Sequence, residues 1–366
     1  MGHSLNLKKK DSLFEQVAQY SLIVLVISCL HPIASFAIYN KNNIDKVTAG
    51  MSLIFIVILN STKMATFLVN KRKFLEVMAE LKDMWKNNSD VTARRRLKEV
   101  NTFSDRMVNS YFYAMIWSTT YFLASPLMKL AWAKITNQPF VRQWITPMRF
   151  IFDAETPPYY EFAIIYTSCV SIPVVVHLLA IDGLFVSFTA NLCAHFMILQ
   201  HNIETNEFTE NNSIIHMQIS SFVKYHIKIL EVASKIYEAY KPIIFGQFVM
   251  TSLQVCVIVY QITTHMDSYV VLITNVLFLL TVLIQLLIYC YGGEIVKLES
   301  LNVGTSVQLT KWYRLQPKYQ KMLCLIMMRS QKAFIMRVGF YDASLASFML
   351  IIKAASSYIT LIQSLE

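Results

Sequence analysis

The chain has 366 residues, of which 55% are hydrophobic and 15% are charged, and its mean hydropathy is +0.43. Soluble proteins carry about a quarter charged residues, and a single core stops growing near about 250–300 residues. The composition therefore excludes an ordinary soluble enzyme and indicates a membrane protein with several spans. The formal net charge of +10 does not indicate nucleic-acid binding, because the basic residues are scattered and no nucleic-acid motif occurs.

Apolar runs of at least about 18 residues predict membrane-spanning helices. Because backbone groups in lipid must be paired within the segment, we expect each run to be helical. The first run follows Lys8, Lys9 and Lys10, as in a signal peptide, but it exceeds the usual apolar region of about 7–15 residues, so we expect a retained span. The seven predicted spans are residues 21–39, 47–69, 110–133, 160–188, 242–263, 269–291 and 343–365.

The Lys and Arg residues set the predicted orientation, because they collect in the cytoplasmic segments of membrane proteins. With an inside N-terminus, the cytoplasmic segments hold 25 of the 33 Lys and Arg residues, and the outer side holds 6. We therefore expect a cytoplasmic N-terminus and an extracellular C-terminus. A G-protein-coupled receptor has the opposite orientation, and no DRY-like or NPxxY-like motif stands at the matching helix ends.

The segments assigned to the cytoplasmic side are long and resemble helices. Residues 74–85 are amphipathic, and residues 214–240 carry apolar residues at roughly helical spacing, which predicts that several spanning helices continue beyond the membrane. Apolar faces in water need partners, so we expect residues 189–241 and 292–342 to pack as a cytoplasmic anchor. No internal repeat or Gly/Ser-rich linker divides the chain, and residues 1–366 are interpreted as one domain.

Several motifs occur in an order that is typical of one family. The strongest are YCYGGEIVKLES (289–300), PKYQKMLCLIMMRSQKAFIM (317–336) and SLASFMLIIKAASSYITLIQ (344–363), and further matches are RFIFDAETPPYYEF (149–162), DGLFVSFTANLCAHF (182–196), YHIKIL (225–230) and GQFVMTSLQVCVIVYQ (246–261). With these motifs the chain resembles the insect odorant receptors.

Two related kinds of receptor differ from this chain. The stretch SYITLIQSL (357–365) lacks the Thr-Tyr and Gln-Phe of the closing motif of gustatory receptors. Residues 189–241 lack the large insertion of the family's co-receptor, so the resemblance is to a ligand-selective subunit.

The resemblance implies an odorant-gated, non-selective cation channel in the plasma membrane of sensory-neuron dendrites. It implies a heterotetramer with the co-receptor, in which the last span of each subunit lines the pore. We expect no catalysis, cofactor or metal site, because nucleophile elbows, phosphate-binding Gly-rich loops and HExxH motifs are absent from the sequence. The alternatives are a gustatory-type or G-protein-coupled-type chemoreceptor and a polytopic transporter. A transporter predicts inverted repeats and broken helices, which the spans do not show in paired positions.

The resemblance also implies an apolar odorant pocket among the outer halves of the second, third, fourth and sixth spans. Small volatile ligands bind by burial, at about 25 cal/mol per Å² of apolar surface, with few directed bonds. Helical spacing selects the candidates, and the hydroxyls of Tyr121, Tyr166 and Ser125 could each make one hydrogen bond to a ligand. The alternative interpretation is that the residues on each such helix face pack against a neighbouring helix. The candidates are Met51, Ile54, Leu59, Trp117, Tyr121, Ser125, Met128, Phe162, Tyr166, Val170, Pro173, Ile273, Asn275 and Phe278.

The last predicted span, residues 343–365, is less uniformly apolar than a helix surrounded by lipid, which suits a helix that faces protein or water. Leu361 and Leu365 share one face and match the positions of the family's apolar gate, where a ring of leucines could close a pore by dewetting. Gln363 and Ser364 could line the conduction path beside this gate. Ordinary helix packing is again the alternative.

Charged residues inside a span are costly, on the order of 3 kcal/mol each. Lys63 and Lys353 lie within predicted spans. We expect Lys353 at a lateral or vestibule-edge position, because an ammonium in a cation pathway repels the permeant ion. Asp182 and His177 are interpreted as structural polar groups of the helical bundle rather than proton relays.

Overall fold

The computed structural model describes residues 13–86, 102, 105–121, 123–124, 135, 147–154, 156–208, 212–264 and 269–365, and these are almost entirely helical. The chain begins with α1 (Leu13–Ser28), α2 (Leu30–Tyr39) and α3 (Ile44–Lys86), and residues 105–121 are also helical. The long helices α5 (Tyr159–Glu204), α6 (Asn212–Thr264) and α7 (Tyr269–Gln308) follow. The last elements are η1 (Trp312–Arg314), α8 (Pro317–Ser330), β1 (Arg337–Val338), β2 (Tyr341–Asp342) and α9 (Leu345–Leu365).

Within the described residues, five helical segments are long and apolar enough to cross a membrane: Gln19–Tyr39, α3, α5, α6 and Val271–Gln308. They correspond to the predicted spans 21–39, 47–69, 160–188, 242–263 and 269–291. The first span is not one unbroken helix, because α1 ends at Ser28 and α2 begins at Leu30. The last predicted span coincides with α9, and only part of the predicted span 110–133 is described, mostly as helix.

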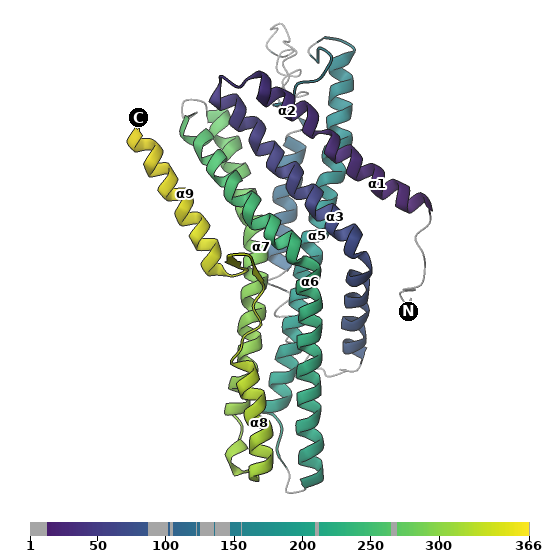
Figure 1. The fold of residues 1–366 in the computed structure, drawn as a ribbon, viewed down its shortest axis with the longest axis vertical. Helices are drawn as coiled ribbons and strands as arrows, with labels where there is room; N and C mark the ends of the chain where they lie inside the picture. The colour runs from purple at the N-terminus through teal and green to yellow at the C-terminus, as the bar shows by residue number, and fades with distance from the viewer. Residues whose placement is uncertain are drawn as a thin grey trace.

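The four longest helices are longer than a bilayer is thick. They have 43, 46, 53 and 40 residues in α3, α5, α6 and α7. At about 1.5 Å per residue, these lengths are roughly 60–80 Å, against about 30 Å of hydrocarbon. In Figure 1, α5, α7, the later-numbered half of α3 and the first half of α6 follow the long axis of the molecule, whereas the rest of α3 and α6 crosses it obliquely; α8 lies beside α7, and α9 leans away from the bundle. The apolar spans and the extensions beyond them are therefore parts of the same continuous helices.

The main core lies where α3, α5, α6 and α7 meet. Its centre includes Phe74, Phe185, Phe188 and Tyr240, all buried, with the Tyr240 ring 5.0–6.3 Å from the three phenylalanine rings and edge-on to each. Such edge-to-face pairs contribute about 0.5–1.5 kcal/mol each beyond the burial of their area. Aromatic packing thus fixes the relative positions of three long helices.

A short hairpin connects α8 to α9. Strands β1 and β2 pair antiparallel, and Gly339 in the two-residue turn has a φ of +57°, which residues with a side chain rarely adopt. Arg337 donates hydrogen bonds to both carboxylate oxygens of Asp342 at 2.7 and 3.2 Å, which lowers the pKa of that carboxyl. The Tyr237 hydroxyl on α6 donates to the Arg337 carbonyl at 2.5 Å. The hairpin is therefore tied to α6 and determines where α9 begins.

Candidate functional site

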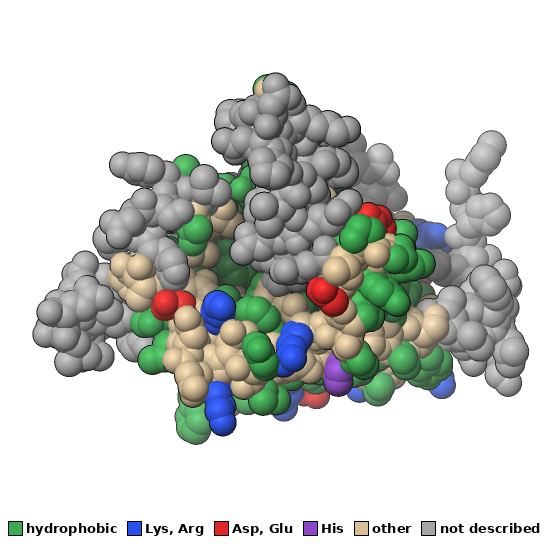
Figure 2. Space-filling model, turned by 90° about the horizontal axis from the view of Figure 1, so that it is seen from above, with side chains coloured by type: hydrophobic (Ala, Val, Ile, Leu, Met, Phe, Trp, Pro, Cys, Tyr) green, Lys and Arg blue, Asp and Glu red, His purple; other side chains and the backbone are tan. Residues whose placement is uncertain are grey.

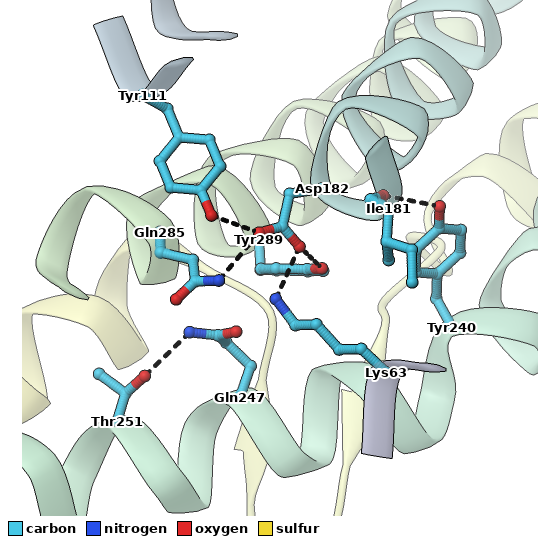
Figure 3. A network of polar contacts seen from close by, with 9 residues as sticks. All are labelled: Lys63, Tyr111, Ile181, Asp182, Tyr240, Gln247, Thr251, Gln285 and Tyr289. Carbon is cyan, nitrogen blue, oxygen red and sulfur yellow. Dashed lines mark hydrogen bonds and ion pairs between the residues drawn. The ribbon is translucent and has the colours of Figure 1, made fainter. Parts of the chain in front are cut away.

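A buried salt bridge joins two of the long helices inside the bundle (Figure 3). The Lys63 ammonium on α3 lies 2.6 Å from Asp182 Oδ1 on α5, and neither side chain is exposed. The Tyr111 hydroxyl and Gln285 Nε2 donate to Asp182 Oδ2 at 2.8 and 2.9 Å, and the Tyr289 hydroxyl donates to Oδ1. These five residues are called the polar cluster. Through it, one carboxylate links α3, the helix at residues 105–121, α5 and α7.

The polar cluster supplies the partners that buried charges require. Removing two ions from water costs several kcal/mol per ion unless charge and hydrogen bonds compensate. Asp182 receives four donors, and Lys63 Nζ also lies 5.0 Å from the centre of the Tyr289 ring, within the range of a cation–π contact. Gln285 and Tyr289 are four residues apart and so share one face of α7. The arrangement is suited to holding four helices in one register.

Lys63 and Asp182 lie inside predicted spans, but the sequence pattern did not predict their pairing, nor did it indicate Tyr111, Gln285 and Tyr289. A signal for the pair was available, because lipid penalises each charge alone and two opposite charges in different spans can relieve each other. The two tyrosines and the glutamine gave no such signal, because their contacts depend on how the helices pack.

Two adjacent glycines follow Tyr289 on α7 and allow close contacts. A Cβ on Gly293 would lie 2.2 Å from the backbone oxygen of Ala343, in the segment that leads into α9. A Cβ on Gly292 would lie 2.7 Å from a ring atom of Phe185 on α5. Because only glycine leaves this space empty, the Gly-Gly pair sets how closely α7 approaches α5 and the start of α9.

Three predicted pocket residues pack into one apolar cluster. Ile54, Tyr166 and Val170 lie with four buried side chains: Val26 of α1, Cys29 between α1 and α2, Ile33 of α2 and Met64 of α3. The Tyr166 hydroxyl is 2.7 Å from Ser28 Oγ and 3.5 Å from Cys29 Sγ. We call this group the Tyr166 cluster. It combines packed apolar side chains with a small polar group around the Tyr166 hydroxyl, which is the chemistry expected of an odorant pocket.

The other predicted pocket residues lie elsewhere. Leu59 is buried and lies beside Gly246 of α6. Phe278 packs on a separate cluster of α6 and α7, which also contacts Ala355 of α9. Two further residues, Pro173 and Asn275, are half-buried. Five are exposed in the single chain: Met51, Trp117, Tyr121, Phe162 and Ile273. Ser125 and Met128 lie outside the described residues.

The end of the molecule that carries α2 is seen end-on in Figure 2. Its described surface is rich in hydrophobic side chains, and the charged side chains between them occur singly. Phe162 and Trp117 of the predicted pocket are also exposed. Large exposed apolar surface is typical of contact with lipid or with a partner subunit.

The predicted gate residues lie near the end of α9. The helix continues to Leu365, so the backbones of Leu361 and Leu365 are one turn apart on one face. The side chains of Leu361, Gln363, Ser364 and Leu365 lie outside the described part of the chain. Lys353 is exposed on the same helix, and α9 packs against α6 and α7.

Comparison with known proteins gives consistent matches along the chain. A family model described as 7tm Odorant receptor matches residues 43–356. Odorant receptor 82a of Drosophila melanogaster is 38% identical over 371 residues, which cover 100% of this chain and 96% of that relative. Odorant receptor 47a of the same species is 26% identical over 367 residues, with 93% and 90% covered.

Solved structures with the same fold also exist. The insect olfactory receptor OR5 from Machilis hrabei in complex with eugenol matches with a TM-score of 0.81 and 17% identity, over 100% of this chain and 93% of that one. A second structure of OR5 from Machilis hrabei matches with a TM-score of 0.79 and 15% identity, over 100% of this chain and 92% of that one. These likenesses show the fold.

Proposed function

This chain belongs to the 7tm odorant receptor family, and we propose that it is a ligand-selective subunit of an odorant-gated cation channel. The observation that carries the proposal is the 38% identity to Odorant receptor 82a over the whole chain. The similarity to OR5, which was solved in complex with eugenol, supports a small volatile ligand. The subunit assembles with the co-receptor as a heterotetramer in the plasma membrane of sensory-neuron dendrites.

The proposed topology has a cytoplasmic N-terminus and an extracellular C-terminus. The excess of Lys and Arg in the segments placed inside supports this orientation. Residues 189–241 and 292–342 form the cytoplasmic anchor of a single domain that comprises residues 1–366. The extension of α3, α5, α6 and α7 well beyond a bilayer's thickness supports such an anchor.

The proposed mechanism starts in an apolar pocket of the outer half of the bundle. There the Tyr166 cluster contributes the hydrogen-bonding tip. Phe278 lies on the separate apolar cluster of α6 and α7, against which Ala355 of α9 also packs, so a shift of α6 or α7 on ligand binding is passed to α9 through that cluster. The ligand shifts the channel toward the open state only by the difference in its affinity for the two states. Leu361 and Leu365 form the gate, and Gln363 and Ser364 line the path beside it.

The test is a panel of volatiles applied to cells that express this chain with and without the co-receptor. We expect an odorant-evoked cation current only when both chains are present. A second-messenger response without current would support a G-protein-coupled-type receptor, and ligand flux without channel openings would support a transporter. Tags at the two ends, probed on intact cells, test the topology: only the C-terminal tag is expected to be accessible.

Replacing Tyr166 by phenylalanine tests the pocket. We expect the half-maximal concentration of an alcohol, ketone or phenol agonist to rise about three- to tenfold, because one hydrogen bond is worth about 0.5–1.5 kcal/mol. Agonists without a polar group should change little. Tyr20→Phe is the matched control, because Tyr20 is exposed on α1. If the Tyr166→Phe variant and the control have the same half-maximal concentration for polar agonists, Tyr166 does not contact the ligand.

A further inference from the structure

A charged cavity lies on the surface between α3 and α6. It has a volume of about 300 Å³ and is lined by Lys73 and Glu76 of α3 and by Ser234, Lys235 and Glu238 of α6. Two ammonium groups, two carboxylates and a hydroxyl therefore face one space. The cavity shares no residue with the polar cluster, the odorant-pocket candidates or the gate.

Two of the four charges are held by partners outside the cavity, and two are not. Lys235 Nζ lies 2.5 Å from Glu80 Oε1, and Arg72 Nε lies 2.9 Å from Glu76 Oε1. Among the described residues, no ion pair joins Lys73 to Glu238, although both line the cavity. The cavity thus offers one ammonium and one carboxylate that are free for a ligand carrying both charges.

The depth of the cavity corresponds to the headgroup layer of a bilayer. The predicted spans end at residue 69 on α3 and begin at residue 242 on α6. Lys73 and Glu238 each lie four residues beyond these limits, which is about 6 Å along a helix. The headgroup layer is about 5–8 Å thick on each side of the hydrocarbon. This placement holds whichever end of the molecule faces the cytosol.

Two exposed apolar side chains lie next to the cavity on the membrane side, with the exposed Lys241 between Glu238 and Phe245 on α6. Val69 lies one turn from Lys73 on α3 and is 83% exposed, and Phe245 lies two turns from Glu238 on α6 and is 49% exposed. Residues at these spacings share a helix face. A charged end that continues into exposed apolar side chains matches a phospholipid, whereas a soluble phosphate compound would not need the apolar part.

The charges select among phospholipid headgroups. An anionic headgroup would leave the Glu238 carboxylate unmatched, whereas a zwitterionic one places its phosphate near Lys73, Lys235 and Ser234 and its amine near Glu238. A primary ammonium donates hydrogen bonds to carboxylates, while quaternary ammonium groups are typically bound by aromatic rings. The five lining residues include no aromatic side chain. We propose that this cavity binds the phosphoethanolamine headgroup of a bilayer phospholipid.

Native mass spectrometry of the solubilised complex of this chain with its co-receptor tests the proposal. Phosphatidylethanolamine, phosphatidylcholine and phosphatidylglycerol with identical acyl chains are titrated in turn. We expect the ethanolamine lipid to bind on the order of threefold more tightly than the choline lipid, because partly exposed charge pairs contribute little each. Glu238→Gln should abolish this preference, and Lys73→Gln should weaken the binding of both zwitterionic lipids. Glu207→Gln and Lys224→Gln, exposed elsewhere on the chain, are the matched controls and should change neither.

Three results would overturn the assignment: equal binding of the two zwitterionic lipids, a preference that survives Glu238→Gln, or tightest binding of the glycerol lipid. Competition by soluble glycerophosphoethanolamine at the same concentration would also overturn it, because the ligand would then not be a membrane lipid. The measurement uses no odorant, so its failure would leave the proposed receptor function untouched.

Discussion

Replacing Asp182 by asparagine is expected to lower the free energy of unfolding by about 3–5 kcal/mol. The reason is that Lys63, which has no exposure to solvent, would remain charged in the core without its counter-charge. For a chain of this size, such a loss corresponds to a fall in the melting temperature of roughly 4–7 °C. The measurement is a thermal melt of the solubilised complex with the co-receptor, followed by size-exclusion chromatography with fluorescence detection.

The partner variants make this prediction specific. Lys63→Met is expected to destabilise less than Asp182→Asn, because the carboxylate keeps its donors Tyr111, Gln285 and Tyr289. The double variant Lys63→Met/Asp182→Asn has no buried charge and should recover most of the lost stability. Arg72→Gln, which removes an exposed ion pair on α3, is the control and should leave the melt unchanged. A double variant that melts as low as Asp182→Asn alone would show that the charge pair is not what stabilises this junction.

Much of the fold could be predicted from the sequence, because lipid imposes strong rules. Runs of apolar residues must be helical in hydrocarbon, and the predicted spans match the described apolar helices within a few residues at most of their outer ends. The amphipathic pattern of residues 74–85 and 214–240 also predicted that α3 and α6 continue beyond the membrane. The break between α1 and α2 was not predicted, although Pro32 marks it: proline has no N–H to donate to the carbonyl four residues earlier, which is that of Ser28.

The candidate site was less predictable, because it depends on contacts between distant segments. Lys63 and Asp182 are 119 residues apart, and their spacing along the chain says nothing about which helices lie side by side. Helical periodicity correctly put Tyr166 and Val170 on one face of one helix. It could not show that Phe278 belongs to another cluster, since periodicity describes each helix alone. Periodicity therefore predicts the faces of single helices but not which other helices lie against those faces.

The Gly-Gly pair on α7 leads to the second prediction with a large expected effect. Gly293→Ala would place a Cβ 2.2 Å from the backbone oxygen of Ala343, 2.7 Å from its Cβ and 3.0 Å from its carbonyl carbon. Backbone atoms cannot turn away as a flexible side chain can, so the start of α9 must move relative to α7. Overpacking of this kind costs about 1–3 kcal/mol. If the closed and open states bear this strain unequally, the ratio of basal to odorant-evoked current changes about tenfold or more.

Three glycine variants give a graded test of that mechanism in recordings with the co-receptor. Gly292→Ala meets the Phe185 ring at 2.7 Å and the Thr189 hydroxyl at 3.2 Å, so we expect a smaller effect, because those side chains can adjust. Gly183→Ala on α5 meets nothing within 4 Å and should leave the currents unchanged, with stability equal or slightly raised, since alanine favours helix over glycine. Ala343→Gly should rescue Gly293→Ala only partly, because it removes the Cβ contact and leaves the backbone oxygen in place. Two results would show that this contact does not position the start of α9. One is full rescue of Gly293→Ala by Ala343→Gly, and the other is a Gly293→Ala response equal to that of Gly183→Ala.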